Sequence, residues 1–136
     1  MPHPYSGGCQ CGAVRYTLNA EPMRVMACHC TECQRQSGSA FGMSMLIKRS
    51  DLVVTGPLKT FTRTADSGNA NTGAFCPECG NRIYNVPGYV EDRLVLKPGT
   101  LDDTSWVRPQ AFIWMQSAQS WVEPPEGMRC FDGQSA

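Results

Sequence analysis

The sequence has no excess of charge of either sign: 12 Lys and Arg residues balance 12 Asp and Glu residues, and charged side chains make up 18% of the 136 residues. A nucleic-acid-binding domain is usually strongly basic, so this balance argues against a polyanionic partner. No apolar run approaches the ~18 residues of a membrane span. The first residues lack the basic and apolar regions of a secretory signal. We therefore predict a cytoplasmic protein that binds neither nucleic acid nor membrane.

The usual enzyme motifs are also missing. The chain has two histidines and contains no Ser/His/Asp arrangement, Walker loop or dinucleotide fingerprint. Its 8 cysteines in 136 residues fall short of the ~8–10% that marks a small disulfide scaffold. In a cytosolic chain thiols stay reduced, and clustered cysteines there more often bind metal. The cysteines are therefore the residues most informative about function.

Short segments of strand character lie between Gly, Pro and Asn turn signals, and no repeat or linker divides them. In the segment 13–18, the alternation of apolar and polar residues would place Val14, Tyr16 and Leu18 on one face of a strand. The expected strands are 13–18, 41–47, 52–55, 58–62, 82–86, 93–97 and 111–116. One helix is expected from Thr31, its N-cap, to Ser37, with Gly38 as the stop. We predict one domain, 1–136, that is mainly β with very little helix.

Two cysteine pairs can together close one metal site. Cys9-x-Cys11 on a strand would point both thiols to one face. Cys76-x-x-Cys79 is followed by Gly80, which lets the chain turn tightly near the sulfurs. A closed tetrahedral zinc needs four ligands, and each pair supplies two. Such a structural zinc would tie the amino-terminal strand to a distant hairpin.

The middle group differs, because Cys28-x-Cys30-x-x-Cys33 offers three ligands with no obvious fourth. Three protein ligands are typical of a catalytic zinc with an open position. Three thiolates around Zn²⁺ leave a net charge of −1 and favour a soft fourth ligand, such as an external thiol. Arg35, the nearest cation in the sequence, would offset the charge that this thiol adds.

Three motifs in this order resemble the glutathione-dependent formaldehyde-activating enzyme (GFA) family, or centromere protein V domain family. They are CQCGAVRY at 9–16, CHCTECQRQSGSAF at 28–41 and FCPECG at 75–80, supported by GTLDD at 99–103, and the resemblance covers roughly residues 6–122. It implies two-tiered antiparallel β-sheets around a structural zinc held by Cys9, Cys11, Cys76 and Cys79. It also implies that Cys28, Cys30 and Cys33 are the active-site ligands.

The resemblance further implies carbon–sulfur lyase chemistry on a small thiol and its aldehyde adduct, namely the condensation of glutathione with formaldehyde to S-hydroxymethylglutathione or a related reaction. The catalytic residues would be Cys28, Cys30, Cys33 and Arg35. The cofactors would be one structural zinc and one catalytic zinc that an open site can lose. Two departures affect the pocket: Phe112 stands where the family often has His, and Ser117-Ala118-Gln119 where it often has a basic residue.

An alternative stays open, in which the chain is a non-catalytic, zinc-stapled protein-interaction module. The middle group would then hold a second structural zinc, with His3, His29 or Cys130 as its fourth ligand. His29 is expected to face away from its cysteine neighbours, toward the surface or in support of the ligands. Cys130 has no assigned role. The sequence also leaves the oligomeric state open, a homo-oligomer included.

Overall fold

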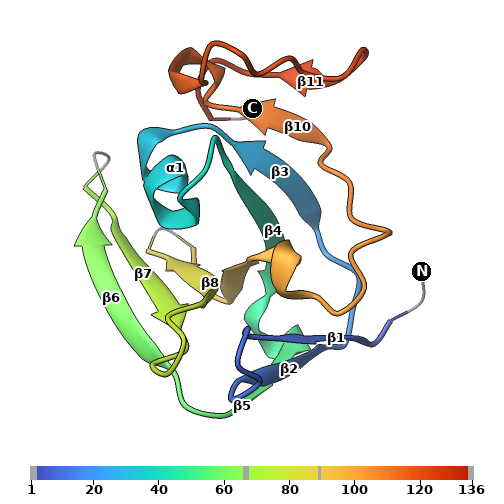
Figure 1. Ribbon diagram of the computed structural model, residues 1–136, viewed down its shortest axis with the longest axis vertical. Helices are drawn as coiled ribbons and strands as arrows, with labels where there is room; N and C mark the ends of the chain where they lie inside the picture. The colour runs from blue at the N-terminus through green and yellow to red at the C-terminus, as the bar shows by residue number, and fades with distance from the viewer. Residues whose placement is uncertain (1–2, 66–67, 89, 135–136) are drawn as a thin grey trace.

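The computed structural model describes residues 3–65, 68–88 and 90–134, which form two β-sheets and one short α-helix (Figure 1). The small sheet has the order β1-β2-β5 and the large one the order β11-β10-β3-β4-β9-β8-β7-β6. The strands are β1 (Tyr5–Gly8), β2 (Arg15–Leu18), β3 (Arg24–Cys28), β4 (Gly42–Lys48), β5 (Leu52–Thr55), β6 (Lys59–Thr64), β7 (Ala70–Phe75), β8 (Arg82–Pro87), β9 (Arg93–Leu96), β10 (Ala111–Ile113) and β11 (Arg129–Cys130). The helix is α1 (Thr31–Ser37), and the 3-10 turns are η1 (Arg49–Asp51), η2 (Pro98–Thr100) and η3 (Met115–Ser117). The prediction of a mainly β fold with two sheets and little helix is confirmed.

One edge of the large sheet departs from the predicted antiparallel arrangement. Strand β10 runs parallel to both β3 and β11, whereas the other strand pairs of the described residues are antiparallel. Parallel neighbours need long connections, and the chain between β3 and β10 and between β10 and β11 supplies them. The returning chain therefore closes the sheet beside β3.

Each of the seven predicted strand segments overlaps a strand of the structure, but four strands were not predicted. Strand β3 is buried at four of its five positions, so its sequence carries no alternation that would reveal it. Strands β1 and β7 contain glycine, alanine and small polar residues of low strand propensity, and β11 has two residues. The segment predicted at 111–116 ends early because Trp114 adopts a left-handed backbone with φ of 59°.

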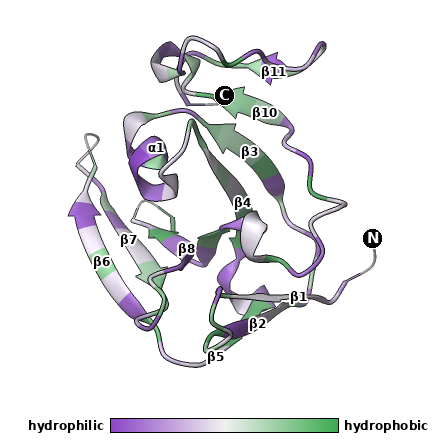
Figure 2. Cartoon of the chain, viewed as in Figure 1, coloured by the Kyte–Doolittle hydropathy of each residue, from purple (hydrophilic) through white to green (hydrophobic). Residues whose placement is uncertain are grey.

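The main core lies between the two sheets. Val14 and Leu18 are fully buried and Tyr16 nearly so, which confirms the predicted face of β2. They pack with Met45 of β4 and Ile83 of β8 in one cluster. Figure 2 shows hydrophobic residues along most of β3, β4 and β10. The amino-terminal strands are thereby attached to the large sheet.

The helix α1 lies inside the curve of the large sheet, with the β6–β7 hairpin on one side and β3 and β10 on the other (Figure 1). An ion pair joins Glu32 to Arg63 of β6, and Gln34 donates to the carbonyl of Ser117 beyond β10. A hydrogen-bonded turn joins Thr104 to Val107. None of the helices described here has the length and apolar character to cross a membrane.

Candidate metal centres

Four cysteines from two distant parts of the chain form the first cluster. The Sγ atoms of Cys9, Cys11, Cys76 and Cys79 all lie within 4.8 Å of one another. Cys11 Sγ is 3.6 Å from Cys9 Sγ and 3.7 Å from Cys76 Sγ. Zn–S bonds of about 2.3 Å in a tetrahedron place sulfurs roughly 3.8 Å apart. The four side chains therefore have the spacing of a closed zinc site.

A backbone group positions the sulfur of Cys9 and favours its thiolate form. Cys9 and Cys11 were expected on a strand, but they lie in the turn after β1. The backbone N–H of Val14 donates to Cys9 Sγ at 3.3 Å. Burial acts to raise the pKa of Cys9, but hydrogen bonds from Val14 and the other three cysteines outweigh it and lower the pKa to about 6. Ligands that ionise readily suit metal binding.

The second pair sits in the predicted tight turn. The N–H of Gly80 donates to the carbonyl of Cys76 at 2.8 Å, and Gly80 has φ of 77°, a conformation that glycine adopts without strain. Asn81 joins the two turns, since its Oδ1 accepts from the N–H of Gln10 at 3.0 Å. Hydrogen bonds lower the pKa of Cys79, and the largest effect comes from the backbone of Asn81.

The second cluster contains three cysteines at the junction of β3 and α1. The Sγ atoms of Cys28, Cys30 and Cys33 lie within 4.8 Å of one another, with Cys28 and Cys30 3.4 Å apart. No fourth His, Cys, Asp or Glu of the described residues joins this group. The three side chains fit a metal that keeps one position open.

The helix start differs from the prediction by one residue. Cys30, not Thr31, is the N-cap of α1, and its Sγ accepts from the N–H of Cys33 at 3.3 Å. Hydrogen bonds from Cys28 and Cys33, together with backbone N–H groups, lower the pKa of Cys30 to about 2. Hydrogen bonds with Cys28 and Cys30, together with burial, raise the pKa of Cys33. Among the three thiols, the contacts favour the thiolate form at Cys30.

Lys97, which sequence reasoning did not identify, is the cation beside this cluster. A Cβ atom placed on Gly42 of β4 would lie 3.3 Å from the Cβ of Cys33 and 3.6 Å from Lys97 Nζ, so both side chains border this glycine. Burial lowers the pKa of Lys97, while Cys33 and the other two cysteines act to raise it. Lys97 follows β9, and only the pairing of β9 with β4 brings it here. No sequence signal would have placed it.

His29 is neither a ligand nor a surface residue. Its side chain is fully buried, between the rings of Phe41 and Phe112 with centroids 4.9 and 5.1 Å away. Nδ1 lies 3.2 Å from the carbonyl oxygen of Ile113. The expectation of a surface position is wrong, because β10 covers this side of β3. Phe112, the departure from the family pattern, forms one wall around the imidazole.

The other two proposed fourth ligands lie elsewhere. Cys130 is exposed on β11, where its Sγ contacts the carbonyl of Met128 at 3.5 Å. His3 is exposed near the amino terminus. Neither residue is part of a metal-ligand group among the described residues. The structure therefore gives the second cluster no protein ligand beyond its three cysteines in the described part of the chain.

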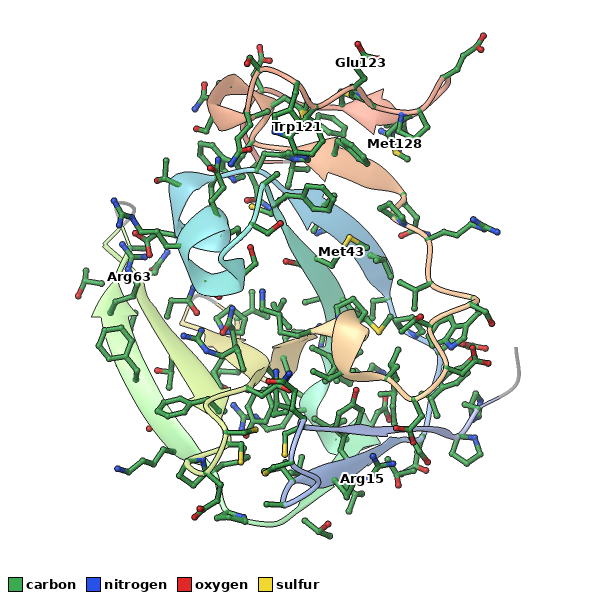
Figure 3. The ribbon with its side chains drawn as sticks, viewed as in Figure 1. Arg15, Met43, Arg63, Trp121, Glu123 and Met128 are labelled. Carbon is green, nitrogen blue, oxygen red and sulfur yellow. The ribbon has the colours of Figure 1, made fainter. Side chains whose placement is uncertain are left out.

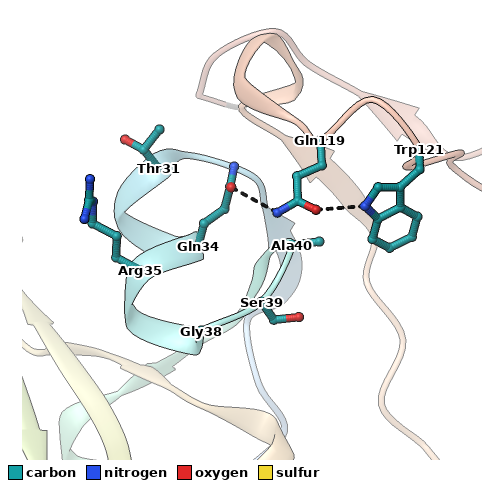
Figure 4. A pocket seen from close by; sticks show the side chains of 8 residues that line it. All are labelled: Thr31, Gln34, Arg35, Gly38, Ser39, Ala40, Gln119 and Trp121. Carbon is teal, nitrogen blue, oxygen red and sulfur yellow. Dashed lines mark hydrogen bonds between the residues drawn. The ribbon is translucent and has the colours of Figure 1, made fainter.

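An open cavity of about 590 Å³ lies along one side of α1 (Figure 4). Gln34 donates to the carbonyls of His29 and Ser117, at 2.8 and 3.0 Å, and so fixes α1 against the segment after β10. Gln119 links Gln34 to the indole of Trp121, whose exposed fraction is 66%. Arg35 is exposed and also lines this cavity. The cavity offers amide groups, one cation and one aromatic ring.

Comparisons with known proteins give a fold neighbour and a family. The chain is similar to a solved crystal structure of a Rhodobacter sphaeroides protein, a structural genomics target, with a TM-score of 0.55 and 17% identity over 93% of this chain and 98% of the other. That likeness concerns the fold. No protein of curated function matches. Residues 4–117, which include the seven clustered cysteines, match the family described as glutathione-dependent formaldehyde-activating enzyme. The chain therefore belongs to this family.

Proposed function

We propose that this protein is a zinc-dependent enzyme of carbon–sulfur chemistry that joins a small thiol to an aldehyde, with glutathione and formaldehyde as the leading pair. The observation that carries the proposal is the three-sulfur cluster with no fourth ligand among the described residues, beside a separate four-sulfur cluster. Family membership supports the same substrates. We place the activity in the cytoplasm, where free thiols stay reduced.

Within this proposal the two clusters have different roles. Cys9, Cys11, Cys76 and Cys79 hold the structural zinc, and Cys28, Cys30 and Cys33 hold the catalytic zinc. A zinc ion bound by three thiolates would supply a soft Lewis acid at which a substrate thiol is kept deprotonated. The reaction forms one S–C bond to the aldehyde carbon, and the thiol proton ends on the aldehyde oxygen. Neither oxidant nor reductant is required.

The surrounding residues bind and orient the substrate and balance its charge. The N–H of Cys33 fixes the Sγ of Cys30. The Lys97 ammonium, close to Cys33, offsets the negative charge that a bound thiolate adds. Arg35 and the exposed ring of Trp121 border the cavity beside α1, and we assign them to the body of the thiol substrate. Holding the thiol and the aldehyde together beside the second cluster would supply much of the acceleration.

The test is the Cys30→Ser variant, with Cys130→Ser as the matched control. We expect the rate of S-hydroxymethylglutathione formation, followed by NMR, to fall at least a hundredfold in Cys30→Ser and to stay unchanged in Cys130→Ser. Zinc content should fall from two ions per chain to one only in the first variant. Full thiol–aldehyde activity in Cys30→Ser would refute this mechanism.

A thiol titration separates this proposal from a non-catalytic interaction module. Glutathione, but not S-methylglutathione, should perturb one of the two zinc ions, as seen by X-ray absorption at the zinc edge. If neither peptide changes the absorption spectrum of either zinc ion, both sites are closed structural sites. The search would then turn to a protein partner.

A further inference from the structure

A second cavity, of about 210 Å³, lies on the side of α1 that faces the β6–β7–β8 region. Its lining contains three arginines from three different elements: Arg35 of α1, Arg63 of β6 and Arg82 of β8. Figure 3 shows Arg63 between the end of β6 and α1. One carboxylate, Glu32, also lines the cavity. The lining therefore carries an excess of two positive charges.

The one carboxylate in this lining, Glu32, already forms an ion pair. Glu32 Oε2 lies 3.2 Å from Arg63 Nε. Neither Arg35 nor Arg82 forms an ion pair with any residue that the structure describes. Two guanidinium groups are thus left without a counter-charge at one small cavity.

Arg82 is the more informative of the two, because it is half-buried and held in place. Its guanidinium lies flat against Gly73 of β7, where a Cβ atom would overlap it. Nη1 donates to Asn85 Oδ1 at 2.7 Å, and Asn85 in turn donates to Gln36 Oε1 at 3.0 Å. These partners are neutral amides, and burial lowers the pKa of Arg82. A fixed, partly desolvated guanidinium without a carboxylate partner favours an incoming oxyanion.

The cavity and the second cysteine cluster share the helix α1. Glu32 stands between Cys30 and Cys33 in the sequence, and Gln36 is one helical turn further on. In the large sheet, the positive charge of Arg82 on β8 acts to lower the pKa of Lys97, the cation next to Cys33. Both sites therefore border the same helix, which is the basis for assigning them to one ligand.

We infer that this cavity is a carboxylate-binding subsite, in which Arg82 and Arg63, with Arg35 at the rim, hold a carboxylate of the thiol substrate. The ligand assignment rests on the proposed function. A volume of about 210 Å³ equals roughly seven water molecules at ~30 Å³ each, enough for a carboxylate and a few methylene groups. The planar guanidinium fork matches a carboxylate through two parallel hydrogen bonds.

A direct binding experiment tests the subsite without any thiol. The zinc-loaded protein is titrated with glutarate, and with glutaramide as its uncharged analogue, while arginine side-chain N–H signals are followed by NMR. We expect saturable shifts at Arg63 and Arg82 with glutarate and none with glutaramide. The variants Arg63→Gln and Arg82→Gln should each lower the affinity for glutarate at least fivefold. Arg93→Gln removes an equally half-buried arginine that does not line the cavity, and should change nothing.

Three results would overturn the inference. They are the absence of saturable glutarate shifts, equal binding of glutarate by Arg63→Gln and the wild type, or tighter binding of inorganic phosphate than of glutarate. Arg63 lies on the edge strand β6, so Arg63→Gln decides the question even if Arg82→Gln fails to fold. Circular dichroism identifies a misfolded variant.

Kinetics then connects the subsite to the substrate. With glutathione, Arg63→Gln should raise KM about tenfold and leave kcat nearly unchanged. With glutathione dimethyl ester, whose carboxylates are masked, the variant and the wild type should have equal KM values. If the wild type shows no turnover, the proposed function fails, but the glutarate titration still tests whether the cavity binds a carboxylate. If turnover is normal and glutarate does not bind, only the subsite fails.

Discussion

At the scale of single residues, the second cysteine cluster shows how charge is arranged around three thiolates. The sequence pointed to Arg35 as the nearest cation, but Arg35 is an exposed helix residue that lines two cavities. The cation beside Cys33 is Lys97, more than sixty positions away in the sequence. Because Lys97 is partly buried, its ammonium interacts more strongly with thiolates than an exposed cation does.

We predict that Lys97→Met weakens zinc binding at the second cluster by about tenfold, as removal of a supporting residue around a metal site typically does. Methionine keeps the length of the side chain and removes its charge. Competition with a chromophoric chelator measures the affinity. Lys48→Met, at the exposed end of β4, is the matched control. An unchanged affinity in Lys97→Met would show that the ammonium does not support the cluster.

At the scale of elements, α1 is a short helix whose position carries the chemistry. It has seven residues with none buried, so its own helix propensity contributes little and its contacts hold it. The cap at Cys30, the hydrogen bonds of Gln34 and the ion pair of Glu32 fix its start and both sides. Its end depends on Gly38, which has φ of 63° and accepts the left-handed conformation.

The predicted effect of Gly38→Ala is a loss of about 1 kcal/mol in the free energy of unfolding, because alanine is strained at positive φ. A Cβ atom at this position meets no other atom within 4 Å, so sterics add nothing. Urea denaturation measures the difference. Gly99→Ala is the control, since Gly99 has equally open surroundings and no positive φ. Equal losses in the two variants would rule out the conformational explanation.

At the scale of the whole molecule, the first cysteine cluster links the two sheets. Cys9 and Cys11 follow β1 of the small sheet, and Cys76 and Cys79 connect β7 and β8 of the large sheet. Cys11 and Cys76 are 65 positions apart. A metal held there would therefore restrict the unfolded chain over a long loop and stabilise the folded state.

The two clusters should accordingly differ in their effect on stability. We expect Cys76→Ser to lower the free energy of unfolding of the zinc-loaded protein by at least about 3 kcal/mol, because it breaks a closed metal site that joins the two sheets. Cys33→Ser, in the second cluster, whose ligands lie close together in the chain, should cost less than about 1 kcal/mol. Urea denaturation of both variants, with zinc content measured alongside, provides the comparison. Equal losses would mean that both sites are structural.

The sequence by itself determined the features that depend on local spacing. The alternation of β2, the extent of α1 and the seven clustered cysteines could all be read from it, because strand and helix periods and metal-ligand spacing involve residues close in the chain. The family motifs belong to the same class. The tertiary structure decided what depends on strand order: the burial of His29 under β10, the position of Lys97 beside Cys33, and the meeting of Arg35, Arg63 and Arg82 at one cavity. Strand order is set by long-range packing between sheets, and no local pattern in the sequence specifies it.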